Sequence, residues 1–528
     1  MVSELRQLLQ DGRYFAQIKQ SEALPTPEEC EGKSTDEVTK LVASKLLGDS
    51  YKLENKPIES GDSGFEVFDI LTSILPVLSE QSAWYWKNAA RPLASMLESA
   101  KYPVRAQAAH LIFWWARLGG LNGLTTLGRT KATRTYWTRD GSNTELSWQI
   151  SHTKSPAEEA NRRVRFAIDP FHPETGLRLA GGGLIDWLWD DGSMGLIDRE
   201  GSKEWKDIIE KWLFPDLKSS DIPVPEAHYA LAFDLEPDGL IGLKSYYVPP
   251  RRQTSETSVA MTGHQTNFEP VGALLPLLHP SLMEPFNMLC DYLQNEGVPS
   301  RLRFIAIASD LVPLEKNRLK LYFFPWADHS FKDVVRDMTL GGRLKGPIVD
   351  DSMANMRKLY RRLFPENADD EDALMKPRDG GVGGLSYYYE FIVGQKEPSP
   401  KVYFDMSNYG ISDLETTKAV ERFMADVGKP ATEGWYTSSL ERAFPHRDLG
   451  ARSGIQTGVT FGMKVKKGWQ ITGYMSTELF APERQVEGER PHETQESLVH
   501  EFYDVYAPGL LKKLYEEQSK AAAAATTA

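Results

Sequence analysis

The chain has 528 residues, of which 41% are hydrophobic and 26% are charged, and its formal net charge is −13. This composition excludes wholesale disorder, and the acidic balance argues against general nucleic-acid binding, which needs a basic surface. Two cysteines, Cys30 and Cys290, exclude a disulfide framework and a cysteine-rich metal site. No apolar run approaches the ~18 residues of a membrane span, and the first residues lack the layout of a signal peptide. We therefore expect a soluble, cytoplasmic protein.

The chain begins with a polar stretch and a helical region. Residues 1–62 are mixed in character, and we expect an N-terminal extension that is partly helical or loop. Residues 65–120 carry apolar side chains at helical spacing, interrupted at Pro76. Short β-rich segments follow, at 133–138, 145–151, 163–169, 228–234, 241–248, 302–308, 318–324, 385–393, 401–406, 455–463 and 469–477.

These segments come largely in pairs, and helix-like stretches separate the pairs. The helix-like stretches are 202–213, 273–294, 331–337, 351–364 and 413–427. Short turns within a pair indicate antiparallel strands, and so many antiparallel strands are expected to close into a barrel that removes their edges. We expect one domain over residues 63–515, an exposed loop at 366–384 and a disordered tail at 516–528.

A cation followed two residues later by a tyrosine recurs on three of these strands. Alternate residues of a strand share a face, so each cation lies beside its tyrosine. A solvated outer face is the ordinary interpretation of any one such strand. Together they favour cationic faces that point into the barrel, where a polyanion such as diphosphate would be needed to neutralise them. The pairs are Lys244 with Tyr246, Lys320 with Tyr322 and Lys401 with Tyr403, and Arg165 and Arg318 lie on the corresponding faces of their strands.

Glu145 is the acidic residue that this pattern singles out. It starts a strand in DGSNTELSW (140–148) and shares a face with Ser147. A surface glutamate after a turn is the simple interpretation. The functional interpretation is a general base inside the barrel.

Metal-dependent chemistry has little support in the sequence. The acidic run at Asp369, Asp370 and Asp372 reads as a solvated loop, and the histidines lack the spacing of a zinc site. The glycine-rich GGVGG at 380–384 follows no expected strand, so it is a weak phosphate-loop candidate. We expect no metal and no other cofactor.

Several motifs, in this order, resemble a known family. They are DGSNTELSW, RVRFAIDP, LKSYYVPP, NRLKLYFF followed by DMTLGG, YYYEF and KVYFDM. Over roughly residues 80–480 the chain is similar to the fungal dimethylallyltryptophan synthase-type (DMATS) aromatic prenyltransferases. The resemblance implies an α+β fold, the ABBA barrel: ten antiparallel strands inside a ring of helices, built from repeated ααββ units.

The resemblance also implies a reaction and a role for each residue of the motifs. A prenyl group, dimethylallyl or longer, would pass from an allylic diphosphate to an aromatic small molecule by electrophilic aromatic substitution, without metal. An indole-type acceptor is favoured, and Glu145 would take its N–H or O–H proton. The residues implied to bind the diphosphate are Arg165, Lys244, Arg318, Lys320 and Lys401. Those implied to shield the cation are Tyr246, Tyr322, Tyr403 and Tyr474.

Two motif positions of the chain depart from the family pattern, and the segment GGLNGLTTLGRTKATRTYW (119–137), where the family contacts its acceptor, is also atypical. Where the family has Gln or His, then Thr and Tyr, this chain reads Gln456, Thr457 and Gly458. Without a tyrosine at Gly458 we expect room for a geranyl or farnesyl chain, or for a larger acceptor. Asp405 stands where the family has proline.

Three other functions remain open at this stage. The first is transfer to a phenolic or polyketide aromatic acceptor, because a carboxylate accepts from O–H as well as N–H. The second is intramolecular capture of the prenyl cation, giving cyclisation, and the third is binding of a phosphorylated or aromatic ligand without catalysis. We expect no nucleic-acid or membrane partner, and the oligomeric state stays open, with a homodimer as one option.

Overall fold

The computed structural model describes most of the chain. The described residues are 8, 23–48, 58, 63–123, 135, 138–152, 162–176, 178–179, 181–190, 193–215, 228–248, 270–295, 302–325, 329–378, 384–429, 434–465 and 467–484.

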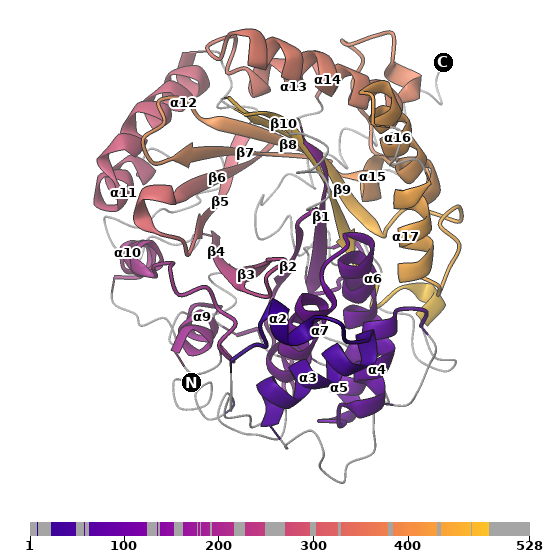
Figure 1. The fold of residues 1–528 in the computed structure, drawn as a ribbon. Helices are drawn as coiled ribbons and strands as arrows, with labels where there is room; N and C mark the ends of the chain where they lie inside the picture. Colours follow the sequence, from indigo (N-terminus) through magenta and orange to yellow (C-terminus); the bar gives the residue numbers. More distant parts are fainter. Residues whose placement is uncertain are drawn as a thin grey trace.

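The centre of the molecule is a closed barrel of ten strands, and each strand pairs with its neighbours antiparallel (Figure 1). The strands follow one another around the barrel in chain order, and β1 closes the ring by pairing with β10. Their bounds are β1 Thr144–His152, β2 Val164–Ile168, β3 His228–Leu235, β4 Ile241–Val248, β5 Leu302–Asp310, β6 Arg318–Pro325, β7 Leu385–Ile392, β8 Ser399–Phe404, β9 Gln456–Lys464 and β10 Gly468–Ser476.

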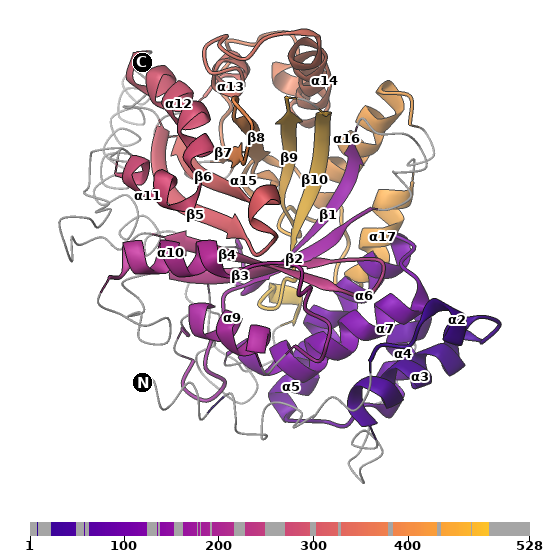
Figure 2. The same cartoon turned by 60° about the vertical axis from the view of Figure 1, so that its left-hand side comes forward.

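Helices surround this barrel on the outside and alternate with the strand pairs along the chain (Figures 1 and 2). The expected ABBA architecture is therefore confirmed. The helices are α2 Pro27–Cys30, α3 Thr35–Leu47, α4 Glu66–Ile74, α5 Glu80–Tyr85, α6 Arg91–Ser99, α7 Val104–Phe113, α9 Gly181–Asp190, α10 Glu204–Leu213, α11 Val271–Leu278, α12 Met283–Asn295, α13 Phe331–Met338, α14 Pro347–Leu363, α15 Met406–Tyr409, α16 Asp413–Asp426 and α17 Trp435–Ala443.

The outward face of the barrel is apolar and packs against these helices. On β3 the ring of Phe233 lies 5.8 Å from that of Phe113 on α7, and on β7 Phe391 lies 6.1 Å from Phe286 on α12. Because neighbouring residues of a strand point to opposite faces, the residues flanking these aromatics point into the barrel. The core therefore lies between barrel and helices, and the acidic residues that flank these aromatics, Asp234 and Glu390, face inward.

Within the predicted extension, α3 packs against α7 and α4, and α2 precedes it. Ser34 caps α3, and the Glu37 carboxylate accepts from its backbone N–H, a reciprocal capping box. Val42 and Leu46 of α3 are fully buried. These helices thus add a second helical layer on one side of the ring, as both views show.

Some expectations about individual elements differ from the structure. The strand expected at 133–138 falls mostly outside the described residues, and Thr135 and Thr138, which are described, belong to no strand. Helices α9 and α17 lie where no helix was expected. The tail at 516–528 lies outside the described residues. None of the described helices combines the length and the apolar character that crossing a bilayer requires.

Candidate active site

The antiparallel register places the five predicted cations on the inward face of the barrel. Lys244 on β4 is opposite Ala232 on β3 and Asp310 on β5, and Lys320 on β6 is opposite Ala308 and Glu390. Each of these two lysines thus has an alanine on one neighbouring strand and an acidic residue on the other. The same faces hold Arg165, Arg318 and Lys401.

Two aspartates on the barrel wall pair with four of these cations. Asp234 lies 3.0 Å from Nε of Arg165 and 2.5 Å from Nζ of Lys244. Asp310 accepts from Nε of Arg318 at 2.5 Å and from Nζ of Lys320 at 2.8 Å. Burial opposes ionisation of both carboxyls, but the cations beside them hold each pKa below its usual range.

Glu390 on β7 is fully buried and joins two cations. It lies 2.9 Å from Nη1 of Arg318 and also accepts from Lys464 on β9, a cation that the sequence analysis missed. Despite burial, Lys464 and Arg318 lower the pKa of Glu390 to about 2. Burial lowers the pKa of Lys464 to about 8, and burial likewise lowers that of Lys244 to about 8, against the opposing effect of their carboxylates.

The expectation that these cations need an outside anion was therefore wrong for most of them. The protein supplies three carboxylates of its own. Among the described residues the cationic cluster still exceeds them: six cationic side chains minus three carboxylates leaves an excess of three cationic side chains. The cluster consists of Arg165, Lys244, Arg318, Lys320, Lys401 and Lys464, and its carboxylates are Asp234, Asp310 and Glu390.

Lys401 has no carboxylate partner among the described residues. Its Nζ instead lies over three tyrosine rings, 5.4 Å from the centroid of Tyr388, 5.6 Å from Tyr403 and 5.7 Å from Tyr474. Gly462 lies opposite Lys401, and a Cβ there would lie 3.1 Å from Cε of Lys401, so this glycine leaves space for the lysine. Burial, together with Arg165 and Lys464, holds the pKa of Lys401 well below its usual value.

The four predicted tyrosines lie together, and Tyr388 on β7 joins them as a fifth. Ring centroids of neighbouring members lie 5.3–6.5 Å apart. Burial raises the pKa of every one of these phenols, so all remain neutral near pH 7. The members are Tyr246, Tyr322, Tyr388, Tyr403 and Tyr474. The rings form a continuous aromatic wall beside the cationic cluster.

Glu145 lies on the same inward surface. On β1 it is opposite Ala167 of β2 and Ser476 of β10. Thr457 of β9 donates a hydrogen bond of 2.7 Å from Oγ1 to Oε1 of Glu145. Burial raises the pKa of Glu145 to about 7, and the nearby Asp405 acts in the same direction. The carboxyl thus titrates close to neutral pH, as a general base is expected to do.

The two departures from the family pattern have clear local surroundings. Gly458 is opposite Tyr474, and a Cβ built on it would approach Phe404 O to 3.4 Å, so a side chain could be carried there. Asp405 caps the short helix α15, where its side chain accepts from the backbone N–H groups of Ser407 and Asn408.

No metal site emerges from the described part of the chain, where no group of three or more His, Cys, Asp or Glu could hold an ion. In the acidic run, Asp372 forms an exposed ion pair with Lys332, and Glu371 pairs with Arg357. These contacts fit the interpretation of this run as a solvated loop.

A closed antiparallel barrel inside a ring of helices, with a cationic and aromatic interior, defines a class of protein, the ABBA prenyltransferase barrel. Solved structures support the fold: NotF in complex with brevianamide F and DMSPP matches with a TM-score of 0.58, 17% identity, and coverage of 76% of this chain and 95% of that one. A prenyltransferase of Pestalotiopsis microspora is 26% identical over 461 residues, 81% of this chain and 95% of the relative. The 4-O-dimethylallyl-L-tyrosine synthase of Claviceps purpurea is 25% identical over 386 residues, 70% of this chain and 83% of the relative.

The model of the tryptophan dimethylallyltransferase family matches residues 81–439. The chain belongs to this family, and it is an enzyme that transfers prenyl groups to aromatic small molecules.

Proposed function

We propose that this enzyme transfers a prenyl group from an allylic prenyl diphosphate to an indole-type small molecule, with no metal ion required. The observation that carries the proposal is the excess of three cationic side chains in the cationic cluster, next to the wall of tyrosines. A prenyl diphosphate has the complementary form: a polyanionic head and an allylic chain that becomes a cation when the head departs.

The diphosphate is held by Arg165, Lys244, Arg318, Lys320 and Lys401, together with Lys464. Arginine binds phosphate oxygens in pairs, and lysine contributes a compact charge. Lys401 supports the assignment most directly, because no carboxylate of the described residues pairs with it. As the bond between prenyl carbon and oxygen breaks, the negative charge that accumulates on the leaving diphosphate is stabilised by cations already in position.

The allylic cation is shielded by Tyr246, Tyr322, Tyr403 and Tyr474, and by Tyr388. A cation over an aromatic face gains about 0.5–2 kcal/mol per ring. The position of Lys401 Nζ, 5.4–5.7 Å from three of these centroids, supports a cation-stabilising role for the wall. Ring faces also keep water away from a cation that water would otherwise quench.

Glu145 binds the acceptor's N–H or O–H and removes its proton, which makes the ring more nucleophilic toward the cation. The pKa of about 7 supports this role, because a substantial fraction is ionised near neutral pH. The ring attacks the cation, and a ring proton then leaves to restore aromaticity.

An indole acceptor is favoured by the family, whose description names tryptophan. A phenolic or polyketide acceptor is the second candidate, because the Claviceps relative is a tyrosine O-dimethylallyl synthase and Glu145 accepts from O–H equally well. We further propose a cytoplasmic role in fungal secondary metabolism, such as alkaloid biosynthesis, which the fungal relatives support.

The test is incubation with dimethylallyl, geranyl and farnesyl diphosphate in the presence of EDTA. Each donor is paired with a panel of indoles, tyrosine and polycyclic phenols, and products are identified by mass spectrometry. A prenylated indole is the expected result. Diphosphate release without an adduct would favour cyclisation of the donor, and no release with any donor would favour a protein that only binds its ligand.

A further inference from the structure

Thr457 of β9 contacts Glu145, and the residue before it, Gln456, contacts helices α16 and α17. In the described part of the chain, the Thr457 hydroxyl is the one hydrogen-bond donor to the Glu145 carboxylate, and it occupies Oε1. No donor among the described residues reaches the second oxygen, Oε2. The acceptor's N–H or O–H therefore meets a carboxylate with one oxygen already engaged.

A bulge at the start of β9 turns Thr457 toward Glu145. Tyr474 of β10 is opposite Gly458, but the next residue, Met475, is opposite Gln456, so Thr457 is the extra residue of the pair. Such a bulge changes the direction of a side chain locally. Without the bulge, the alternation of side chains along a strand would place Thr457 on the face opposite to that of Gly458, and its side chain would point out of the barrel.

The bulge is fixed from outside by polar contacts to two helices. Asp413 of α16 accepts from the backbone N–H groups of Ile455 at 3.1 Å and Gln456 at 2.8 Å. The Gln456 side chain donates to Asp413 O at 2.9 Å and accepts from the Tyr436 hydroxyl of α17 at 2.9 Å. The strand residue before Thr457 is thus held at both backbone and side chain.

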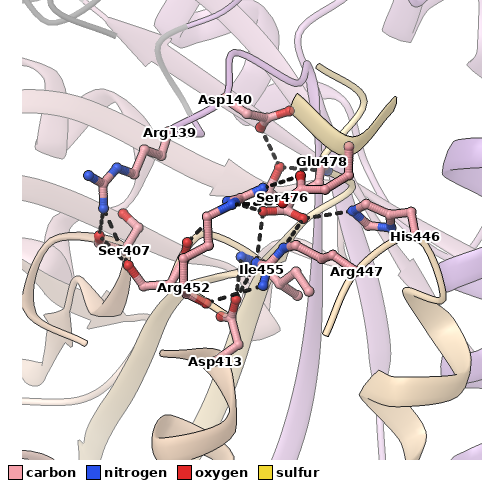
Figure 3. A network of polar contacts seen from close by, with 12 residues as sticks. Arg139, Asp140, Ser407, Asp413, His446, Arg447, Arg452, Ile455, Ser476 and Glu478 are labelled. Carbon is pink, nitrogen blue, oxygen red and sulfur yellow. Dashed lines mark hydrogen bonds and ion pairs between the residues drawn. The ribbon is translucent and has the colours of Figure 1, made fainter. Parts of the chain in front are cut away.

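Asp413 is itself held by a buried ionic cluster (Figure 3). Arg447 donates to the Asp413 carboxylate and lies 2.8 Å from Glu478, which also accepts from Arg452 at 2.9 Å and from His446 at 2.8 Å. Glu478 follows β10 with a positive φ of 48°, a strained conformation that the surrounding contacts maintain. The ends of β9 and β10 are thereby fixed to each other and to α16.

From this arrangement we propose that Thr457 is a positioning residue, which holds Glu145 so that only Oε2 faces the acceptor and so determines which ring atom meets the prenyl cation. The proposal rests on the proposed function of Glu145 as the acceptor's base. A carboxylate fixed at one oxygen accepts from one direction. A carboxylate free to rotate accepts the same N–H in several orientations of the ring, and more than one ring position is then prenylated.

The experiment compares Thr457→Val, which keeps the shape and removes the hydroxyl, with Thr457→Ser, which keeps the hydroxyl. Loss of a hydrogen bond to a charged group predicts a kcat lower by about 10- to 100-fold for the valine variant. We also expect the acid limb of its pH profile to lie at higher pH, because the hydroxyl stabilises the ionised carboxylate of Glu145. In addition, we expect this variant to form a broader mixture of prenylated isomers. The serine variant should match the wild type in kcat, in the pH profile and in the mixture of isomers. The KM for the donor should stay unchanged in both variants.

Thr416→Val on α16 is the matched control, because Thr416 is buried and donates only to Ser412 O of its own helix turn. Thr457→Ala replaces the valine variant if a thermal melt shows that valine does not fold. The positioning role would be overturned if the variant without the hydroxyl kept the wild-type kcat, the wild-type acid limb of the pH profile and the wild-type pattern of prenylated isomers. Absence of prenyl transfer by the wild-type enzyme itself would instead overturn the proposed function.

Discussion

Lys320 donates a hydrogen bond of 2.8 Å to Asp310 on the neighbouring strand, and both side chains are nearly fully buried inside the barrel. This pair shows how the enzyme tolerates a cationic interior before any substrate arrives. Internal carboxylates neutralise part of the charge, and the remainder is available to a diphosphate.

Replacing Asp310 by Asn should destabilise the fold strongly, because Arg318 and Lys320 then lose their shared carboxylate. Breaking a buried ion pair costs about 3–5 kcal/mol. Asp372→Asn is the control, since Asp372 pairs with Lys332 on the surface, where a change within about 0.5 kcal/mol is expected. Chemical denaturation measures both, and equal losses for the two variants would contradict the account. Added inorganic diphosphate should restore part of the stability of the Asp310 variant.

Replacing Lys401 by Met should weaken donor binding without weakening the fold. Lys401 has ring contacts but no carboxylate partner in the part of the chain that the structure describes, so its removal breaks no ion pair there. Loss of a hydrogen bond between charged groups predicts an affinity for a non-reactive thiolo-diphosphate analogue lower by about 10- to 100-fold. Titration calorimetry measures the affinity for the analogue, and a thermal melt on the same preparation measures the stability of the fold. Unchanged affinity would contradict the assignment of Lys401 to the diphosphate site.

Activity should pass through a maximum between about pH 7 and pH 8. Glu145 must be ionised to take a proton, and its pKa of about 7 means that kcat falls as the pH drops below that value. Lys244 and Lys464 have pKa values of about 8, so they lose their charge as the pH rises and donor KM should increase. A profile of kcat and donor KM from pH 5.5 to 9.5 separates the limbs. A flat kcat across pH 6–8 would contradict the assignment of Glu145.

Gly458→Tyr should shift donor preference toward the five-carbon chain. The Cβ fits against Phe404 O at 3.4 Å, and the new ring would lie beside Tyr474, its cross-strand neighbour. The added ring occupies space that a geranyl or farnesyl chain would use. A competition between dimethylallyl and geranyl diphosphate measures the ratio of products, and an unchanged ratio would show that Gly458 does not limit chain length.

Much of the barrel could be predicted from the sequence, because two signals are local. Alternation of cation and tyrosine on β4, β6 and β8 identifies one face of each strand, and turn residues between paired strands indicate antiparallel neighbours. Helix α3 lies in the extension expected to be partly helical or loop, and its start had a local signal, since Ser34 followed by Glu37 is a capping box. Helix α9 begins with three glycines, which are poor helix formers, so its local sequence does not favour a helix.

The charge balance of the site could not be predicted from the sequence. Asp234, Asp310 and Glu390 come near strand ends, where an acid followed by turn residues ordinarily reads as solvated. Asp234 pairs with Lys244, and Asp310 with Lys320, across hairpins of ten residues. The pairs of Arg165 with Asp234 and of Arg318 with Glu390 join segments about 70 residues apart, and no local pattern shows them. Lys464 was missed for the same reason, because it lies at the end of β9 beside the turn to β10 and reaches Glu390 only across the barrel wall.

The most direct test of the account is to measure turnover and donor binding side by side in the wild type and in Glu145→Gln. Loss of a general base predicts turnover lower by about 100- to 10,000-fold, while affinity for the diphosphate analogue stays within about threefold. The variant should be folded and at least as stable as the wild type at pH 8. The pKa of the Glu145 carboxyl is raised from 4.5 to about 7, so its contribution to the stability of the fold is fully present below pH 4.5 and is lost as the pH rises through 7. Turnover near the wild-type rate would contradict the account, because the cationic cluster would then work without the base to which we assign the acceptor's activation.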